Sequence, residues 1–156
     1  MIKLNIPGRG SLALENLMLD FNGTLALGGR LLPEVSQLLH QLASHLRIYV
    51  VTADSHGTVA EETASLPVTL LPVKEGAEAE GKLAHLQSLG VAGTAAMGNG
   101  SNDRLLLQEA ALGIMVLGEE GAAGCLCAAA DLIVRDYREG LRLFLVPDAI
   151  RSTLRS

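Results

Sequence analysis

The chain has 156 residues, the size of one ordinary domain, and it is long enough to bury a hydrophobic core without disulfides or metals. Apolar residues make up 49% of it but aromatic residues only 3%, which predicts an aliphatic core. A net charge of −5 without a Lys/Arg cluster argues against nucleic acid as a partner, and no apolar run approaches the ~20 residues of a membrane span.

The first half of the chain predicts a hairpin followed by strands that alternate with helices. Residues 2–6 and 11–20 flank a Pro-Gly-Arg-Gly turn and predict an N-terminal β-hairpin that leads into the first core strand. The pattern then predicts, in order, an amphipathic helix over 32–45 with Pro33 near its start, a buried strand over 47–52, a short helix over 57–65 and a strand over 67–73.

The second half continues the same alternation. It predicts a helix over 78–89 that stops at Gly90, a strand over 93–97, a polar loop over 98–103, a helix over 103–111, a strand over 113–117, a helix over 119–130, a strand over 132–134 and helix from about Tyr137. Such alternation predicts an α/β fold: a Rossmann-like three-layer α/β/α sandwich with a mainly parallel sheet. We see no linker or repeat, so we expect residues 1–156 to form a single domain.

The most informative stretch follows the first core strand. An apolar run ends in Asp20, and the chain turns at once through Asn22, Gly23 and Thr24. Ligands of open α/β sheets bind beyond the carboxyl ends of the strands. We therefore expect a nucleophilic carboxylate and phosphate-binding donors at this edge. The loop after Asp20 is short, which leaves no room for a cap domain.

Three further features fall at the same predicted edge. Thr52 ends a Val-Val-Thr run, Lys82 lies on the helix before the fourth strand, and the loop Gly-Asn-Gly-Ser-Asn-Asp carries Asn99 and Asp103. Phosphoryl transfer through an aspartate uses such parts: a carboxylate, a hydroxyl, an amine and oxygen ligands for a divalent cation.

Each of these residues also has an ordinary structural explanation. Asp20 could be a turn residue, Thr52 a strand residue, Lys82 a solvated helix lysine, and Asp103 an acid that favours a helix N-terminus. Their occurrence together, in this order, favours the functional interpretation.

The four segments together resemble the haloacid dehalogenase superfamily over nearly the whole chain. The first motif of that superfamily reads D-x-D-G-T-L, where this chain has D-F-N-G-T-L; the fourth reads G-D-G-x-N-D, where this chain has G-N-G-S-N-D. The resemblance implies a hydrolase, a phosphatase that forms an aspartyl phosphate.

The resemblance also implies a role for each matching residue. Asp20 would be the nucleophile, Thr52 would bind the phosphoryl group, and Lys82, with Lys74 as a weaker rival, would balance the charge of both. Gly23, Thr24 and Ala53 would adjoin the phosphorylated substrate. Mg²⁺ would be held by Asp20, the main-chain carbonyl of Asn22, Asn99 and Asp103.

Two departures from the motifs are amides in place of acids. Asn22 replaces the residue that usually protonates the leaving group and activates water, a role that asparagine cannot take, and acid–base catalysis of this kind contributes about 10²–10⁴-fold. We therefore expect slow turnover, as in a capless relative of the P-type ATPase phosphorylation domain, which carries threonine there. Asn99 brings no charge to the metal, so we expect weaker metal binding. The alternative is a non-catalytic or regulatory binding protein that keeps the fold.

Other expectations concern the remainder of the chain. Cys125 and Cys127 lack a second ligand pair, which argues for small core residues on an Ala-rich helix rather than a zinc site. The acidic run at Glu75, Glu78 and Glu80 indicates a solvated face. A site without a lid suits a bulky substrate or a lid from a second subunit, so a homo-oligomer is a further expectation. Without an apolar leader, we expect a cytoplasmic protein that uses neither membrane nor nucleic acid.

Overall fold

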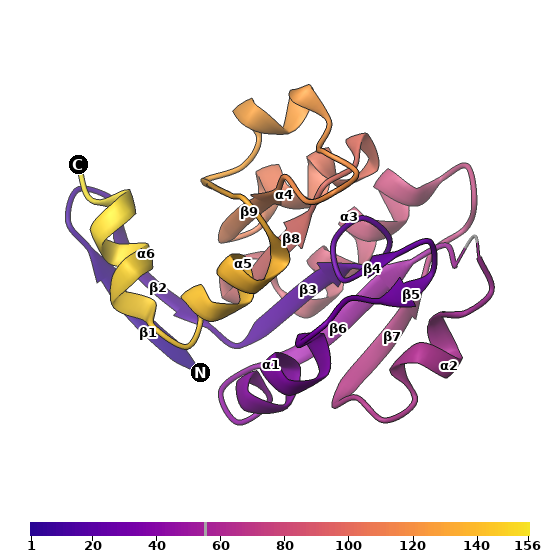
Figure 1. The fold of residues 1–156 in the computed structure, drawn as a ribbon. Helices are drawn as coiled ribbons and strands as arrows, with labels where there is room; N and C mark the ends of the chain where they lie inside the picture. Colours follow the sequence, from indigo (N-terminus) through magenta and orange to yellow (C-terminus); the bar gives the residue numbers. More distant parts are fainter. Residues whose placement is uncertain (55) are drawn as a thin grey trace.

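The computed structural model describes residues 1–54 and 56–156. Its centre is a six-stranded sheet in the order β10-β9-β8-β3-β6-β7, in which every paired strand runs parallel (Figure 1). The strands are β3 (Asn16–Asp20), β6 (Arg47–Thr52), β7 (Val68–Pro72), β8 (Thr94–Gly98), β9 (Leu112–Val116) and β10 (Leu132–Val134). The α/β prediction with a parallel sheet is confirmed.

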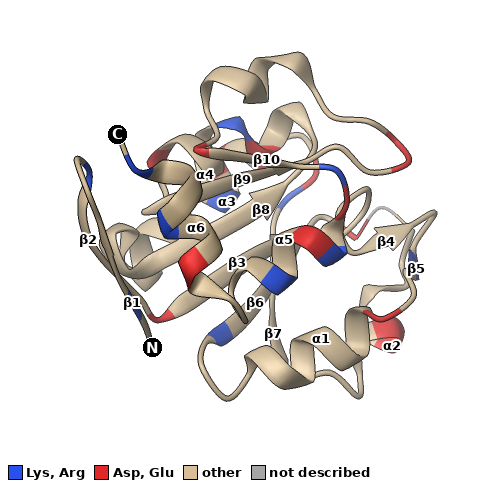
Figure 2. Ribbon diagram, turned by 60° about the vertical axis from the view of Figure 1, so that its left-hand side comes forward, with Lys and Arg blue, Asp and Glu red and all other residues tan. Residues whose placement is uncertain are grey.

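Helices cover both faces of this sheet. One face packs against α1 (Val35–Leu42), α5 (Tyr137–Leu143) and the neighbourhood of α2 (Val59–Thr63), and the other packs against α3 (Glu78–Leu89) and α4 (Arg104–Glu109). Successive residues of β3 alternate between the two cores, with Leu17 and Leu19 in one and Met18 in the other. Because β3, β8 and β9 are buried on both faces, they carry almost no charged residues. Elsewhere, Lys and Arg are scattered among Asp and Glu (Figure 2).

The predicted N-terminal hairpin is present and stands beside the main sheet. β1 (Ile2–Ile6) and β2 (Gly10–Leu14) pair antiparallel, and the C-terminal helix α6 (Pro147–Leu154) packs against β1 (Figure 1). Ile2, Leu4 and Ile6 alternate into the large core together with Ile150 of α6. The hairpin and α6 therefore extend the main core rather than forming a second one.

The structure contains a small hairpin that the sequence did not indicate. β4 (Ala26–Leu27) and β5 (Arg30–Leu31) form a tiny antiparallel hairpin around Gly28 and Gly29, both with positive φ. We call this segment, residues 26–31, the flap. It lies directly after the Asp20 turn, where only a short loop was expected.

Several helices differ from their predicted bounds. The helix expected over 32–45 begins only at Val35, since Glu34 before it has a φ of 66°. The C-terminal helix is broken into α5 and α6 just before Pro147, whose ring cannot continue a helix.

The helix predicted over 119–130 is wrong. Only a short 3₁₀ turn, Gly124–Ala128, is present there, with Leu126 as its buried residue. The segment offers one large apolar side chain for burial, and Gly121 adopts a positive φ, so a regular helix has little to stabilise it. Cys125 and Cys127 are both exposed free thiols, which contradicts their expected place in the core. No helix within residues 1–54 and 56–156 is long and apolar enough to cross a membrane.

Candidate active site

The carboxyl ends of β3, β6 and β8 bring the predicted residues to one edge of the sheet. Asp20 is the last residue of β3 and lies opposite Val51 of β6, so Thr52, which ends β6, follows directly beside it. Asn99 follows the last residue of β8 on the other side. Asp20, Thr52 and Asn99 are all buried. The parallel register alone therefore assembles three of the four segments.

Lys82 joins these loops into one charged cluster. It projects from α3, is only 1% exposed, and its Nζ donates to Asp20 Oδ1 at 2.7 Å and to Asp103 Oδ1 at 2.5 Å. Nζ also donates to Asn102 Oδ1 at 3.4 Å. A buried ammonium needs such partners to offset its lost hydration. Lys74 is exposed, so the geometry favours Lys82 over its rival.

Burial and neighbouring charges shift the pKa values of this cluster. Desolvation, followed by the nearby Asp103 charge, raises the pKa of Asp20 to about 7 against the opposing effect of Lys82. For Lys82, burial lowers the pKa, but the charges and hydrogen bonds of Asp20 and Asp103 outweigh it and leave the pKa above its ordinary value. The cluster thus holds a lysine cation beside a carboxyl that titrates near neutrality.

Asp103 acts through its neighbours. One carboxylate oxygen pairs with Lys82, and the other accepts the main-chain N–H groups of Asn99 at 3.1 Å and Gly100 at 3.0 Å. With no exposed surface, this side chain closes the 98–103 loop and orients the lysine. Both of its oxygens are therefore already engaged within the protein.

Thr52 and Thr24 hold the two flanking loops. The Thr52 hydroxyl accepts the N–H of Asp54 at 3.1 Å, and Ala53 lies half-buried between them. Thr24 is fully buried, and its hydroxyl donates to Asn99 Oδ1 at 3.4 Å. Thr24 therefore links the first loop to the fourth, while Thr52 and Ala53 border the same hollow as Asp20.

Asn22 is tied to the flap. Its Oδ1 accepts the N–H of Gly29 at 3.1 Å, and the Gly29 carbonyl accepts the hydroxyl of Thr58 at 2.6 Å. Gly29 has a φ of 78°, and a Cβ there would meet Thr58 Oγ1 at 2.7 Å. The amide at position 22 therefore keeps the hydrogen-bond acceptor that an acid would offer, without its proton chemistry.

Asn99 anchors the loop that follows β9. Its Nδ2 donates to the Gly121 carbonyl at 3.3 Å, which a carboxylate could not do, and its own carbonyl accepts the N–H of Ala123 at 2.8 Å. This loop brings the carboxylate of Glu120 against the first motif. A Cβ on Gly23 would fall 2.7 Å from Asn99 Oδ1 and 2.7 Å from Glu120 Oε2. Only glycine leaves room for both groups.

These residues line a hollow of about 260 Å³, which we call the catalytic hollow. Three acids that the sequence did not assign to the site also border it: Glu75, Glu78 and Glu120. Glu75 and Glu78 were expected on a solvated face, and no local motif marks Glu120. The residues that line the catalytic hollow are Asp20, Asn22, Thr52, Ala53, Glu75, Glu78, Lys82, Asn99, Gly100, Asn102 and Glu120.

The donor set fits a hard divalent cation. Within residues 1–54 and 56–156 there is no group of three or more His, Cys, Asp or Glu side chains arranged for a metal. Mg²⁺, however, commonly uses one or two carboxylates together with neutral oxygens and water. Asp20 supplies a carboxylate to the catalytic hollow, Asn99 an amide oxygen and Glu120 a second carboxylate.

Comparisons with known proteins give one sequence relative. No family model matches the chain. An uncharacterised protein of Methanocaldococcus jannaschii is 43% identical over 60 residues, which is 38% of this chain and 64% of the archaeal protein. The match thus spans less than two thirds of that protein, and its name assigns no activity.

Solved structures share the fold over nearly the whole chain. A 3-deoxy-D-manno-octulosonate 8-phosphate phosphatase from Moraxella catarrhalis, in complex with magnesium, phosphate and the sugar, has a TM-score of 0.72 at 17% identity and covers 91% of this chain and 94% of its own. The cobalt-bound phosphatase of Haemophilus influenzae has a TM-score of 0.72 at 13% identity, covering 92% and 94%. A hydrolase of the haloacid dehalogenase superfamily from Legionella pneumophila has a TM-score of 0.67 at 17% identity, covering 90% and 87%.

The predicted fold is confirmed by these neighbours, which are phosphatases and hydrolases of the haloacid dehalogenase superfamily. At such identities the likeness concerns the fold alone.

Proposed function

We propose that the chain is a divalent-metal-dependent phosphohydrolase that acts through an aspartyl phosphate on Asp20. The observation that carries this proposal is the buried cluster in which Lys82 contacts both Asp20 and Asp103 at the ends of the strands. A buried lysine between two carboxylates is costly to fold, and it is suited to holding the charge of a phosphoryl group. The phosphatases among the structural neighbours support the same reaction class.

In the first step, an Asp20 oxygen attacks phosphorus and the bond from phosphorus to the ester oxygen breaks. That oxygen leaves with the electron pair and takes a proton from water, because the Asn22 amide is too weak an acid to protonate it. In the second step, water attacks phosphorus, inorganic phosphate is released and the Asp20 carboxylate is restored. Thr52 and Lys82 would hold phosphoryl oxygens. The Gly23 N–H donates to the Ala26 carbonyl and the Thr24 hydroxyl donates to Asn99 Oδ1, and these two hydrogen bonds keep the first loop in place.

Asp20, Asn99 and the main-chain carbonyl of Asn22 would hold the cation, and Glu120 would add the charge that Asn99 lacks. Mg²⁺ is our choice because the donors are hard oxygens. When bound, the cation would neutralise phosphoryl oxygens and favour the ionised form of Asp20. Asp103, expected as a ligand, serves in this proposal as the positioning residue for Lys82.

Several expectations remain predictions. The proposed substrate is a phosphorylated sugar, since two of the neighbours named above are phosphatases of a sugar phosphate. We further propose slow turnover, kinship with the P-type ATPase phosphorylation domain, a homo-oligomer and a cytoplasmic location.

Turnover of p-nitrophenyl phosphate with Mg²⁺ tests the proposal. We expect slow release of nitrophenol by the wild type and none by Asp20→Asn. Equal turnover by the two proteins would contradict it. Absence of turnover, together with no thermal shift on addition of Mg²⁺ and beryllium fluoride, would favour the alternative, a non-catalytic or regulatory binding protein.

A further inference from the structure

A second and larger hollow adjoins the catalytic one. It has a volume of about 410 Å³, which is in the range of small-ligand sites, and we call it the side hollow. The two hollows meet at Glu120, which borders both, and at consecutive residues of the first loop, where Asn22 lines one and Gly23 the other. A ligand fixed at Asp20 could therefore extend into the side hollow.

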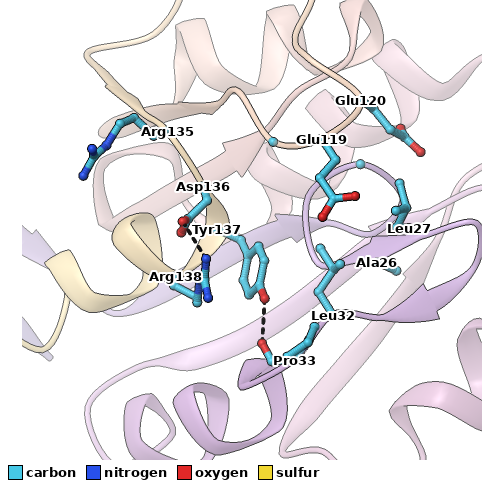
Figure 3. A pocket seen from close by; sticks show the side chains of 12 residues that line it. Ala26, Leu27, Leu32, Pro33, Glu119, Glu120, Arg135, Asp136, Tyr137 and Arg138 are labelled. Carbon is cyan, nitrogen blue, oxygen red and sulfur yellow. Dashed lines mark hydrogen bonds and ion pairs between the residues drawn. The ribbon is translucent and has the colours of Figure 1, made fainter.

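The walls of the side hollow are partly apolar. The flap contributes Ala26 and Leu27, and Leu32 and the Tyr137 ring lie across from Glu119 (Figure 3). The Tyr137 hydroxyl donates to the Pro33 carbonyl at 2.7 Å, which fixes the ring. Leu27 is 38% exposed, so an apolar side chain at the mouth is free for contact. These walls suit the carbon skeleton of a small molecule.

The arginines at the rim are already neutralised. Arg138 pairs with Asp136 at 3.0 Å and with Glu34 at 3.5 Å, and its guanidinium lies 5.5 Å from the centre of the Tyr137 ring. Arg135 pairs with Glu139 and points away from the hollow (Figure 3). Each of these two arginines therefore already has a carboxylate partner.

Glu119 differs from these arginines in its lack of an ion-pair partner among the described residues. Among the residues that the structure describes, Glu119 makes no hydrogen bond or ion pair through its carboxylate, which points toward Ala26 and Leu32 (Figure 3). Glu120 stands at the junction, and Glu75 and Glu78 border the catalytic hollow. Lys82, the cation of that hollow, is committed to Asp20 and Asp103. A group that extends from the catalytic hollow into the side hollow thus meets the Glu119 carboxylate, for which the described residues supply no ion-pair partner.

We propose that the side hollow receives the leaving group of the phosphate ester, and that it selects a hydroxylated leaving group of about one sugar ring that carries a cationic amine. This inference rests on the proposed function. Glu119, an exposed residue at the edge of the side hollow, would be its specificity-determining residue, because opposite charges attract and like charges repel. A sugar acid phosphate would be disfavoured at the same position.

Three hexose derivatives of nearly equal size provide the test: glucosamine 6-phosphate, glucose 6-phosphate and 6-phosphogluconate. They should be assayed with Mg²⁺ near pH 7, where amines of this kind are largely protonated. We expect kcat/KM to fall in that order, with a ratio of about tenfold or more between the amine and the acid. Glu119→Gln should reduce this ratio severalfold.

Glu109→Gln is the matched control, since Glu109 is exposed on α4 outside both hollows and its loss removes the same charge. It should leave the ratio unchanged. Four results would each overturn the inference while leaving the proposed phosphohydrolase activity intact. They are equal kcat/KM for the three compounds, a preference for the acid, turnover of p-nitrophenyl phosphate alone, and equal effects of Glu119→Gln and Glu109→Gln. Failure of every ester, p-nitrophenyl phosphate included, would overturn the proposed function itself.

Discussion

At the scale of single residues, Asn22 holds the flap but cannot act as the acid that an aspartate could be. Its Oδ1 accepts a hydrogen bond from the Gly29 N–H and so holds the flap, and its amide is too weak an acid to protonate a leaving group. An aspartate at this position can accept the same hydrogen bond and also exchange a proton. We therefore expect that replacing the amide by a carboxyl group restores the acid.

Asn22→Asp should raise turnover of p-nitrophenyl phosphate. General acid–base catalysis contributes about 10²–10⁴-fold, so we expect a gain of at least about tenfold in kcat. Steady-state rates at saturating Mg²⁺ measure it. Asn22→Ala is the matched control: it loses the contact with Gly29 and should show no gain. An Asn22→Asp protein no faster than the wild type would contradict the role assigned to this position.

Asp20 predicts an unusual dependence of stability on pH. Its pKa rises from the ordinary 3.8 to about 7 in the folded protein, so between these values the folded state keeps a proton that the unfolded state has released. The contribution of Asp20 to stability therefore falls as pH rises from about 4 to about 7 and is level above that. Asparagine does not titrate.

Asp20→Asn should accordingly raise the Tm of the metal-free protein, relative to the wild type, more at pH 8 than at pH 4. Thermal unfolding of both proteins with a chelator, over that pH series, measures the difference. A Tm difference that stays constant with pH would show that the carboxyl is not held in its protonated form by burial.

At the scale of elements, the sheet was predictable and the loop after β9 was not. Apolar runs ending in Asp20 and Thr52 indicated two strands of a parallel sheet, and the structure shows that these strands are neighbours. The Asn99 amide donates to the Gly121 carbonyl and so holds the loop that places Glu120 beside Gly23. Glu120 and Gly23 are far apart in the sequence, and no local sequence pattern predicts such a contact. The flap was missed for a similar reason: two residues per strand are too few for a period.

This loop gives the prediction for the metal. Glu120→Gln should weaken Mg²⁺ binding by about tenfold, because it removes a full charge beside the neutral Asn99. Isothermal titration or the Mg²⁺-dependent shift in Tm measures affinity without relying on turnover. Glu119→Gln removes the neighbouring charge, which faces the side hollow, and is the matched control. Equal weakening of Mg²⁺ binding by both variants would contradict a specific role of Glu120, because any nearby negative charge would then have the same effect.

At the scale of the whole molecule, the N-terminal hairpin and the C-terminal helix share the core of the sheet. The N–H of Ser156 donates to the Pro7 carbonyl at 3.2 Å, and Arg9 pairs with Asp131 at 2.7 Å. Ile150 of α6 is fully buried in the same core. We therefore expect the hairpin, the helix and the sheet to unfold together, as a single domain would.

Ile150→Ala tests this expectation. The loss of a buried isoleucine should lower the free energy of unfolding by about 2–5 kcal/mol and shift the entire transition. Urea unfolding followed by far-ultraviolet circular dichroism and by tyrosine fluorescence measures it, because coincident curves indicate one cooperative unit. Two separated unfolding transitions would contradict the expectation that the chain unfolds as a single domain.

The covalent intermediate on Asp20 is the central claim, and mass spectrometry tests it most directly. The protein is incubated with acetyl phosphate and Mg²⁺, quenched in acid and digested. We predict one added phosphoryl group on the peptide that contains Asp20, and its absence in Asp20→Asn and in samples treated with hydroxylamine, which cleaves acyl phosphates. No adduct on the wild type, or an adduct that survives in Asp20→Asn, would contradict the account.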